Sequence, residues 1–261
     1  MLGAAFFLGT AGSGKTSLVD AYSNFLNERN ISCSTVNLDP AVLTLPYNPD
    51  VDIRNFVDIA KLLRDRTLGP NGAIVAAMDI LATNLGDFLD ELSSLGSDYL
   101  LVDTPGQLEL FAFREIGPVL VDRIEAPQKA SIFLLDPLIL QSDTGVASLL
   151  LLSASASLRL RIPSLNVISK ADIVGQSVLE ELVERFENPD EFQKTIKHQN
   201  LSDYLALRLI ETVFEVSTPS IPLPVSVFDV ATLANLHAEV QRFFLGGSSE
   251  DVGQSQGAED D

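Results

Sequence analysis

Residues 9–16 read Gly9-Thr10-Ala11-Gly12-Ser13-Gly14-Lys15-Thr16, which matches the pattern G-x4-G-K-[ST]. Small residues let successive backbone N–H groups turn onto phosphate oxygens, an approach that larger side chains would block. A helix that begins near Lys15 would add unpaired N–H groups and a partial positive charge. The Lys15 ammonium suits the β and γ phosphates, and the Thr16 hydroxyl suits Mg²⁺. The loop therefore predicts a triphosphate site formed by Gly9, Gly12, Ser13, Gly14, Lys15, Thr16 and Ser17.

Short apolar runs surround this loop and recur along the chain between segments with helical periodicity. The runs are continuous rather than alternating, as expected of strands that are buried on both faces. Predicted strands cover 4–8, 34–38, 99–102, 131–135, 165–168 and 225–228, and predicted helices cover 15–29, 71–95, 190–216 and 231–245. This rhythm predicts an α/β fold with a doubly wound, mostly parallel sheet and helices on both faces, the P-loop NTPase fold.

The 261 residues allow one large domain, which we expect to span 1–245. Residues 246–261 carry five acidic side chains and almost nothing apolar, so we expect them to form a disordered tail. The apolar run at 2–8 has no basic residue before it and is too short to span a membrane. We therefore expect a buried first strand there and no membrane partner.

The formal net charge is -19, which repels nucleic acid from most of the surface, so we expect no nucleic-acid partner. A phosphorylated ligand must instead meet a local positive site. Solubility or habitat would also explain the acidity. Cys33 is the single cysteine, which excludes an internal disulfide and fits a reducing, cytoplasmic compartment, and its apolar surroundings predict burial.

A second candidate segment, Asp103-Thr104-Pro105-Gly106-Gln107, directly follows the third apolar run. Ligands of open α/β sheets bind at the carboxyl ends of the strands, so Asp103 should face the phosphate loop and hold Mg²⁺ through a water. The Gly106 N–H can reach the γ-phosphate, and Gln107 can orient an attacking water.

Asp39 ends the second apolar run, directly before Pro40. Its carboxylate is a candidate for water activation or for the outer shell of the magnesium ion. A turn in which Asp39 bonds its own backbone before the proline explains the residue equally well. The residues alone leave both possibilities open.

The segment Ser169-Lys170-Ala171-Asp172 follows the run at 165–168. A carboxylate at Asp172 can accept two hydrogen bonds from guanine N1–H and N2–H₂, whereas adenine would leave that charge unpaired. The stem of Lys170 can lie across the ring. After the last predicted strand, Ser226 and Val227 are candidates for backbone contacts with the base edge. Together with the earlier motifs, this segment favours guanine over adenine and hence GTP as the substrate.

A further tripeptide, Gly69-Pro70-Asn71, lies between the second and third predicted strands. With the phosphate loop, Asp39-Pro40-Ala41 and the two later segments, it makes residues 1–245 resemble the GPN-loop GTPases, and the short single-domain form resembles the archaeal members. The resemblance implies homodimers or heterodimers, and we expect a homodimer for this chain. It also implies that the loop 69–71 of one subunit places Asn71 at the γ-phosphate of the other. It further implies that Asp39, Gln107 and Glu109 position the catalytic water, in a catalytic set that includes Asn71 and Asp103.

The resemblance implies a GTP-hydrolysing, nucleotide-controlled switch or assembly factor, since eukaryotic relatives act in assembly or import of RNA polymerase. Many dimeric P-loop proteins carry an extra lysine in the first half of the loop that acts across the interface, and Thr10 occupies that position here. A polar loop of the partner would then have to offset the negative charge of the transition state. Arg54, Arg64, Arg66 and Arg114 remain candidates for that task. The rival hypotheses are a P-loop phosphotransferase acting on a small molecule or an RNA end, and a module that binds GTP without hydrolysis.

Apolar residues are unusually dense in two segments, 108–120 and 138–152. They predict either ordinary core packing or a dimer surface with a groove for other proteins.

Overall fold

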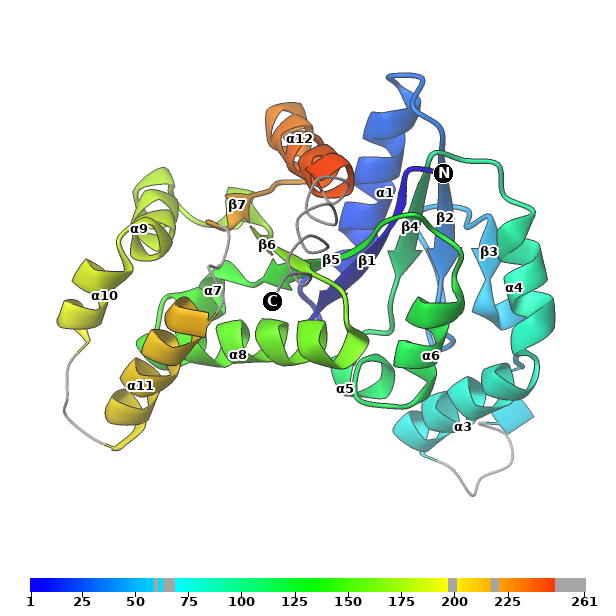
Figure 1. Ribbon diagram of the computed structural model, residues 1–261, viewed down its shortest axis with the longest axis horizontal. Helices are drawn as coiled ribbons and strands as arrows, with labels where there is room; N and C mark the ends of the chain where they lie inside the picture. The colour runs from blue at the N-terminus through cyan, green and yellow to red at the C-terminus, as the bar shows by residue number, and fades with distance from the viewer. Residues whose placement is uncertain (59–60, 63–68, 197–200, 217–220, 247–261) are drawn as a thin grey trace, which may run out of the picture.

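In the computed structural model, a seven-stranded sheet runs through the centre of the molecule with helices on either side (Figure 1). The structure describes residues 1–58, 61–62, 69–196, 201–216 and 221–246. Strand order is β3-β2-β4-β1-β5-β6-β7, and every described pair is parallel. The strands are β1 (Gly3–Gly9), β2 (Cys33–Asn37), β3 (Val51–Asp52), β4 (Tyr99–Asp103), β5 (Lys129–Leu135), β6 (Ser164–Ile168) and β7 (Leu223–Pro224). The predicted doubly wound α/β fold is confirmed.

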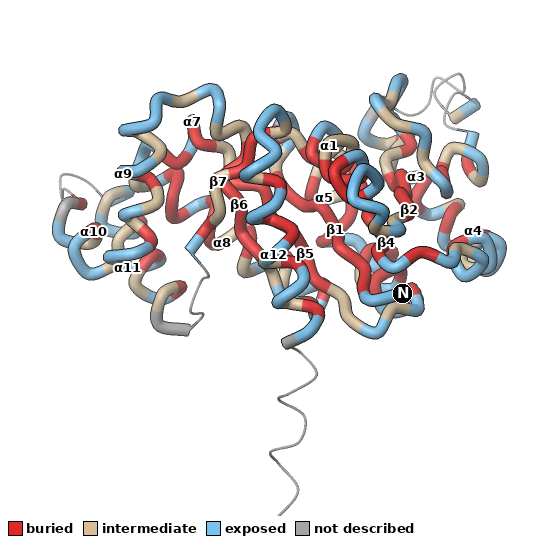
Figure 2. The backbone as a smooth tube through the Cα atoms, turned by 90° about the horizontal axis from the view of Figure 1, so that it is seen from above, coloured by how far each residue is buried: buried red, intermediate tan, exposed pale blue. Residues whose placement is uncertain are grey.

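Strand β1 lies in the middle of the sheet, and all seven of its residues are buried. Its side chains alternate between two cores: Phe6 and Leu8 belong to one, and Phe7 belongs to the other. A strand that is buried on both faces in this way needs the continuous apolar run seen in the sequence. Figure 2 shows the sheet as a largely buried interior between more exposed helices.

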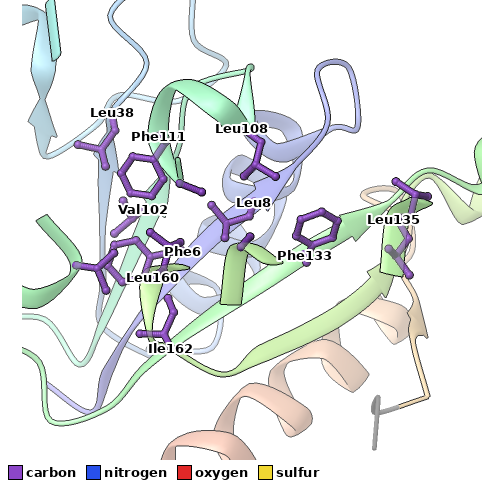
Figure 3. Packing of buried hydrophobic residues seen from close by; sticks show 14 of the residues in the cluster. Phe6, Leu8, Leu38, Val102, Leu108, Phe111, Phe133, Leu135, Leu160 and Ile162 are labelled. Atoms are coloured by element: carbon purple, nitrogen blue, oxygen red, sulfur yellow. The ribbon is translucent and has the colours of Figure 1, made fainter. Parts of the chain in front are cut away.

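The smaller core lies between the sheet and helices α1 and α12, where Tyr22 and Leu236 pack against Phe7 and Leu101. The larger core fills the other face, where Phe111 and Leu160 lie around Phe6, and Phe133 belongs to the same cluster (Figure 3). The helices are α1 (Lys15–Asn27), α3 (Pro70–Thr83), α4 (Leu85–Ser93), α5 (Leu108–Phe111), α6 (Ile116–Arg123), α7 (Pro137–Leu140), α8 (Asp143–Leu160), α9 (Gln176–Glu187), α10 (Pro189–Thr195), α11 (Leu201–Val216) and α12 (Val230–Gly246).

The structure corrects two of the predicted helices. The helix expected at 71–95 is two helices, α3 and α4, which meet at Asn84 with a bend of 73°. The sequence Thr-Asn-Leu-Gly at that point contains poor helix formers, which periodicity alone does not register. The helix expected at 190–216 is likewise divided, because α10 ends at Thr195, Ile196 is extended, and α11 begins at Leu201.

Two strand predictions also need correction. The last strand is β7 at 223–224 rather than 225–228. Prolines at 222 and 224 interrupt the apolar run there, and proline is tolerated in a strand at the edge of a sheet. Strand β3 was not predicted, because two paired residues leave no periodicity to detect. Cys33 is half-buried rather than fully buried, since it opens β2 near the surface.

The dense apolar segments 108–120 and 138–152 belong mostly to the larger core. Their buried members are Leu108, Phe111, Ala112, Ile116, Leu120, Leu140, Val146, Ala147, Leu149 and Leu150. Phe113, Val119, Leu138 and Ile139 remain exposed. Core packing therefore accounts for most of the density, and four side chains are left for contacts outside the chain.

Within the described residues, no single helix combines the length and the apolar composition needed to cross a bilayer, and only the bent pair α3 and α4 meets both criteria jointly. Gly246 closes α12, and the rest of the predicted tail, 247–261, lies outside the described residues.

Candidate nucleotide site

The phosphate loop joins the end of β1 to the start of α1. Gly12 and Gly14 adopt φ angles of 77° and 96°, which side-chain-bearing residues rarely tolerate. Gly14 is also the N-cap of α1 and has no capping side chain, so the first N–H groups of that helix stay available. The loop thus has the backbone conformation that an anion-binding helix start requires.

Two polar atoms of this site are buried without a hydrogen-bond partner: Ser13 Oγ and Asp103 Oδ1. Leaving such groups unpaired costs about 1–3 kcal/mol each, so a folded protein retains them where a ligand can satisfy them. Lys15 Nζ meanwhile donates to the carbonyl oxygens of Gly9 at 3.0 Å and Thr10 at 3.1 Å. Burial lowers the pKa of Lys15, and the charges of Asp103 and Asp39 oppose that shift. A phosphate group would accept hydrogen bonds from Ser13 Oγ and Lys15 Nζ, whereas Asp103 Oδ1, an acceptor, would need a cation or a donor.

Asp103 ends β4 beside β1 and lies at the phosphate loop, as predicted. Burial raises its pKa to about 6, and hydrogen bonds from the Thr16 and Tyr47 hydroxyls and the charge of Lys15 act in the opposite direction. The Tyr47 hydroxyl donates to Asp103 Oδ2 over 3.1 Å. A nearby cation would favour the ionised form of this carboxyl, because its positive charge offsets the cost of burying the negative charge.

The donor set fits magnesium bound jointly by protein and nucleotide. Among the described residues, no three His, Cys, Asp or Glu side chains gather into a metal-binding group. The Thr16 hydroxyl and the orphaned Asp103 Oδ1 would therefore share the ion with phosphate oxygens and water, the arrangement that Mg²⁺ prefers. Asp39 is bonded elsewhere in this structure and its role as a ligand stays a prediction.

Asp39 connects the end of β2 to the segment after β4. Its Oδ2 accepts a hydrogen bond from the Gly106 N–H at 3.1 Å, and its Oδ1 accepts one from the Ala41 N–H at 2.9 Å. The second bond is the turn that the sequence left open as an alternative, and the first is a long-range contact that sequence could not show. Asn37 holds the Asp39 backbone from both sides, through its Oδ1 and its Nδ2.

Arg54 is bound to residues that support the loop carrying Asp39. Its Nε donates to both carboxylate oxygens of Asp52, and its Nη1 donates to the carbonyl of Val42. Asp52 in turn accepts from Asn37, so the ion pair supports the loop that carries Asp39. Arg54 is therefore occupied in this conformation, Arg114 is exposed, and Arg64 and Arg66 lie outside the described residues.

The tripeptide at 69–71 begins α3, with Gly69 as N-cap and Pro70 in the first turn. Asn71 is exposed, and its Oδ1 accepts a hydrogen bond from Gln107 Nε2 at 3.2 Å within the same chain. Glu109 is exposed in the first turn of α5. The structure thus brings Asn71 to the predicted water-positioning residue of its own chain, and its action across a dimer stays a prediction.

The predicted base site lies beyond the end of β6. Lys170 has a φ of 52°, and its Nζ forms an ion pair with Asp136 at 2.9 Å. Its stem passes close to Gly14, because a Cβ at Gly14 would lie 3.7 Å from Lys170 Cε. Asp172 is exposed, as a carboxylate awaiting a base edge would be. The base site and the phosphate loop are therefore connected through Lys170.

Ser226 and Val227 follow β7 on the neighbouring segment. The Ser226 N–H donates to the Thr232 hydroxyl, so it is not free for a base in this conformation. Val227 is half-buried. The base contacts assigned to these two residues stay predictions.

Sequence reasoning missed three residues of this site: Tyr47, Asn37 and Asp136. Asp136 directly follows β5, so the rule applied to Asp39 and Asp103, a carboxylate after a buried strand, would have found it. Tyr47 lies in a connecting loop with no pattern around it, and nothing in the sequence signals its contact with Asp103.

Comparisons with known proteins agree with this geometry. A family model described as "Conserved hypothetical ATP binding protein" matches residues 7–244. GPN-loop GTPase PAB0955 from Pyrococcus abyssi is 33% identical over 82% of this chain and 86% of its own length. The chain belongs to the GPN-loop GTPases. GPN-loop GTPase 3 of Dictyostelium discoideum is 34% identical over 76% of this chain and 70% of its own.

The fold of this GPN-loop GTPase matches that of a solved relative. The crystal structure of PAB0955 in its apo form superimposes with a TM-score of 0.85 at 30% identity, covering 93% of this chain and 98% of the other. The family model is named for ATP, whereas the relatives are named GTPases. A carboxylate at Asp172, in the predicted base site, agrees with guanine. GTP binding and hydrolysis are thus the activity of this chain, which sets aside the phosphotransferase and the non-hydrolysing module.

Proposed function

We propose that this GPN-loop GTPase is a Mg²⁺-dependent homodimer whose nucleotide state controls the separation of the loops that carry Asp39 and Gly106. The observation that carries the proposal is the 3.1 Å hydrogen bond between the Gly106 N–H and Asp39 Oδ2. The same N–H is the donor that a γ-phosphate requires. GTP and GDP therefore differ in whether Asp39 must give up its bond, which is the differential contact that a switch needs.

In hydrolysis, the chain positions the reactants and stabilises charge. Lys15 leaves its carbonyl partners and turns to the β and γ phosphates, while the first N–H groups of α1 bind phosphate oxygens. Gln107 orients a water in line with the bond between the γ-phosphorus and the bridging oxygen, and breaking that bond yields GDP and phosphate. Mg²⁺ would neutralise charge on the phosphate oxygens while Asp103 and Thr16 hold it.

Two features support a partner subunit at the site. Asn71 is exposed at the outer edge of the site. Arg54 is held by Asp52, so a group that offsets the negative charge of the transition state has to come from elsewhere. Assembly of RNA polymerase or of another complex as the process served is an analogy with eukaryotic relatives, and a cytoplasmic location stays a prediction from the single cysteine.

Phosphate release, with light scattering to measure the mass, tests the proposal. Turnover should require Mg²⁺, fall with Gln107→Ala and occur in a species of twice the chain mass. Mixed dimers pair a subunit carrying Asn71→Ala with one carrying Lys15→Ala, which leaves a single competent nucleotide site. Near-normal turnover per competent site would show that Asn71 acts from the partner, and the low rate of the Asn71→Ala homodimer would show that it acts within its own chain. A monomer with full turnover, or turnover that persists in EDTA, would overturn the proposal.

A further inference from the structure

A pocket of about 820 Å³ lies at the sheet edge away from the nucleotide. Its walls come from the length of α6, from the first residue of β5 and from the end of α8, and the helices α6 and α8 contact each other (Figure 1). Lys129 opens β5, and Ile162 precedes β6, whereas the phosphate loop follows the last residue of β1. In a parallel sheet, starts and ends of strands lie at opposite edges, so this pocket is separate from the GTP site.

The charge of the pocket is opposite to that of the protein. Its lining holds four cations, Arg123, Lys129, Arg159 and Arg161, and two carboxylates, Glu115 and Asp122. The whole chain has 17 basic and 36 acidic residues, so this excess of cations is a local exception. A cationic hollow on an anionic surface concentrates anions there.

The three arginines are available to a ligand. In the part of the chain that the structure describes, the ion pairs involve other cations and none of these three. Lys129 differs, because its Nζ donates to the Val121 and Asp122 carbonyls at the end of α6. The arginines therefore supply the unpaired donors, and Lys129 supplies positive charge from the pocket wall.

Arg161 has a second unusual property. It caps α8 with a φ of 58°, a left-handed conformation that glycine adopts without strain and arginine does not. Replacing Arg161 by glycine would therefore relieve strain and remove a pocket cation in one step. This separates the stability of the fold from the binding capacity of the pocket.

Apolar surface accompanies the charge. Leu158 is 80% exposed and Val119 is 42% exposed, and both line the pocket beside Pro118 and Ile162. A ligand that fits would carry several carboxylates and at least one apolar side chain.

The chain itself contains such a segment. Residues 247–261 include five carboxylates, no cation and one branched apolar residue, Val252, directly after Glu250 and Asp251. The chain has a formal net charge of -19, so most of its surface would repel this segment.

The segment begins at the same edge of the sheet as the pocket, on the opposite face. Near the end of α12, the Phe244 ring stacks on Tyr99 with centroids 6.0 Å apart. Tyr99 pairs with Gly3 at the start of β1, and the next residue of β1, Ala4, pairs with Lys129. The end of α12 therefore lies at the sheet edge where β5 begins, about two strand spacings or ~10 Å from β5 along the sheet, on the face opposite to α6 and α8. Fifteen residues reach up to ~50 Å when extended, so the distance is easily covered.

We propose that the acidic segment 247–261 binds in this pocket of its own chain, with its carboxylates on Arg123, Arg159 and Arg161 and with Val252 against Leu158. Tethering raises the effective concentration of the segment to the millimolar range, so weak individual ion pairs suffice. An acidic segment of another protein would have to displace it. The proposal is independent of GTP turnover.

A labelled peptide with the sequence of 247–261 tests the proposal by fluorescence anisotropy, against the full chain and a chain ending at Gly246. The shortened chain should bind at least tenfold more tightly, because its pocket is vacated, and 0.5 M salt should abolish the binding. Arg123→Gln with Arg159→Gln in the shortened chain should weaken binding about tenfold. Lys194→Gln with Arg208→Gln removes the same charge from exposed positions of α10 and α11 and should change little. Equal weakening by both pairs, or equal affinity of the full and shortened chains, would overturn the proposal.

Arg161→Gly gives an independent check within the shortened chain. Its melting temperature should rise while its affinity for the peptide falls severalfold. A peptide in which every Asp and Glu is replaced by its amide should not bind at all. Binding of that neutral peptide, or full affinity in a stabilised Arg161→Gly variant, would contradict the proposed contacts.

Discussion

The backbone nitrogen of Gly106 lies 3.1 Å from Asp39 Oδ2 and donates a hydrogen bond to it. A single N–H cannot serve this carboxylate and a γ-phosphate oxygen equally, and the two anions repel each other. Under our proposal, binding of GTP is therefore expected to separate the loop after β2 from the loop after β4. GDP lacks the γ-phosphate and is expected to leave the bond intact.

Replacing Asp39→Asn should raise the preference for GTP over GDP. The change removes a negative charge that faces the γ-phosphate and weakens the competitor for the Gly106 N–H. We expect the ratio of the two affinities to rise about tenfold, or ~1.4 kcal/mol, in EDTA, where metal effects are absent. Titration with fluorescent nucleotides measures the ratio. Asp87→Asn, at an exposed position of α4, is the matched control, and an unchanged ratio in Asp39→Asn would count against the switch.

Replacing Asp103→Asn should stabilise the nucleotide-free protein while abolishing turnover. Burial raises the pKa of Asp103 to about 6, from the model-compound value of 3.8, so the folded chain binds this proton more tightly than the unfolded chain. Stability from this group is therefore greatest at acidic pH and declines as the pH rises toward 6. The variant should gain up to ~3 kcal/mol in free energy of unfolding at pH 7 and about half of that at pH 5.

Urea denaturation in EDTA at the two pH values measures this gain. Asp98→Asn, an exposed position just before β4, should show no comparable change. A gain for Asp103→Asn that is larger at pH 5 than at pH 7 would have the wrong sign and would refute the assignment of burial as the cause.

Asn71 and Gln107 should act as one unit in turnover. Gln107 Nε2 donates to Asn71 Oδ1 over 3.2 Å, so removing either residue leaves the other without its partner. Asn71→Ala should slow phosphate release about tenfold with little effect on GTP affinity, and the double variant should be no slower than Gln107→Ala alone. Asn55→Ala, an exposed residue after β3, serves as the control. Losses that multiply in the double variant would show independent roles.

Two carboxylates near the base position should have separable effects. Asp172→Asn should weaken GTP binding at least tenfold and permit xanthosine triphosphate, because the amide offers a donor where guanine needs an acceptor. Asp136→Asn loosens the Lys170 ion pair and should weaken both nucleotides by a similar factor. Competitive binding of the two triphosphates to each variant distinguishes them, and a switch of base preference in Asp136→Asn would reverse our assignment.

The central strands were predictable because burial on both faces leaves an unbroken apolar run, as at Phe6, Phe7 and Leu8. The start of the first helix was predictable from a different signal, the phosphate-loop motif that ends in Gly14 and Lys15. Prediction failed where the deciding factor was local chemistry within a periodic pattern, as at Asn84, or pairing without a pattern, as at Val51. Among the site residues, the sequence offered the turn in which Asp39 takes part, but it could not show the contact of Asp39 with Gly106, which is 67 residues away.

By itself, the sequence determined the phosphate loop, because left-handed glycines and a helix start depend on steric limits within a few neighbouring residues. It also determined the fold class, because continuous apolar runs predict strands that are buried on both faces. Only the tertiary structure decided that Tyr47 supports Asp103, that Asp136 holds Lys170, and that arginines from α6 and α8 share one pocket. These contacts depend on which strands become neighbours, and the order of strands in a sheet follows from packing of the whole chain.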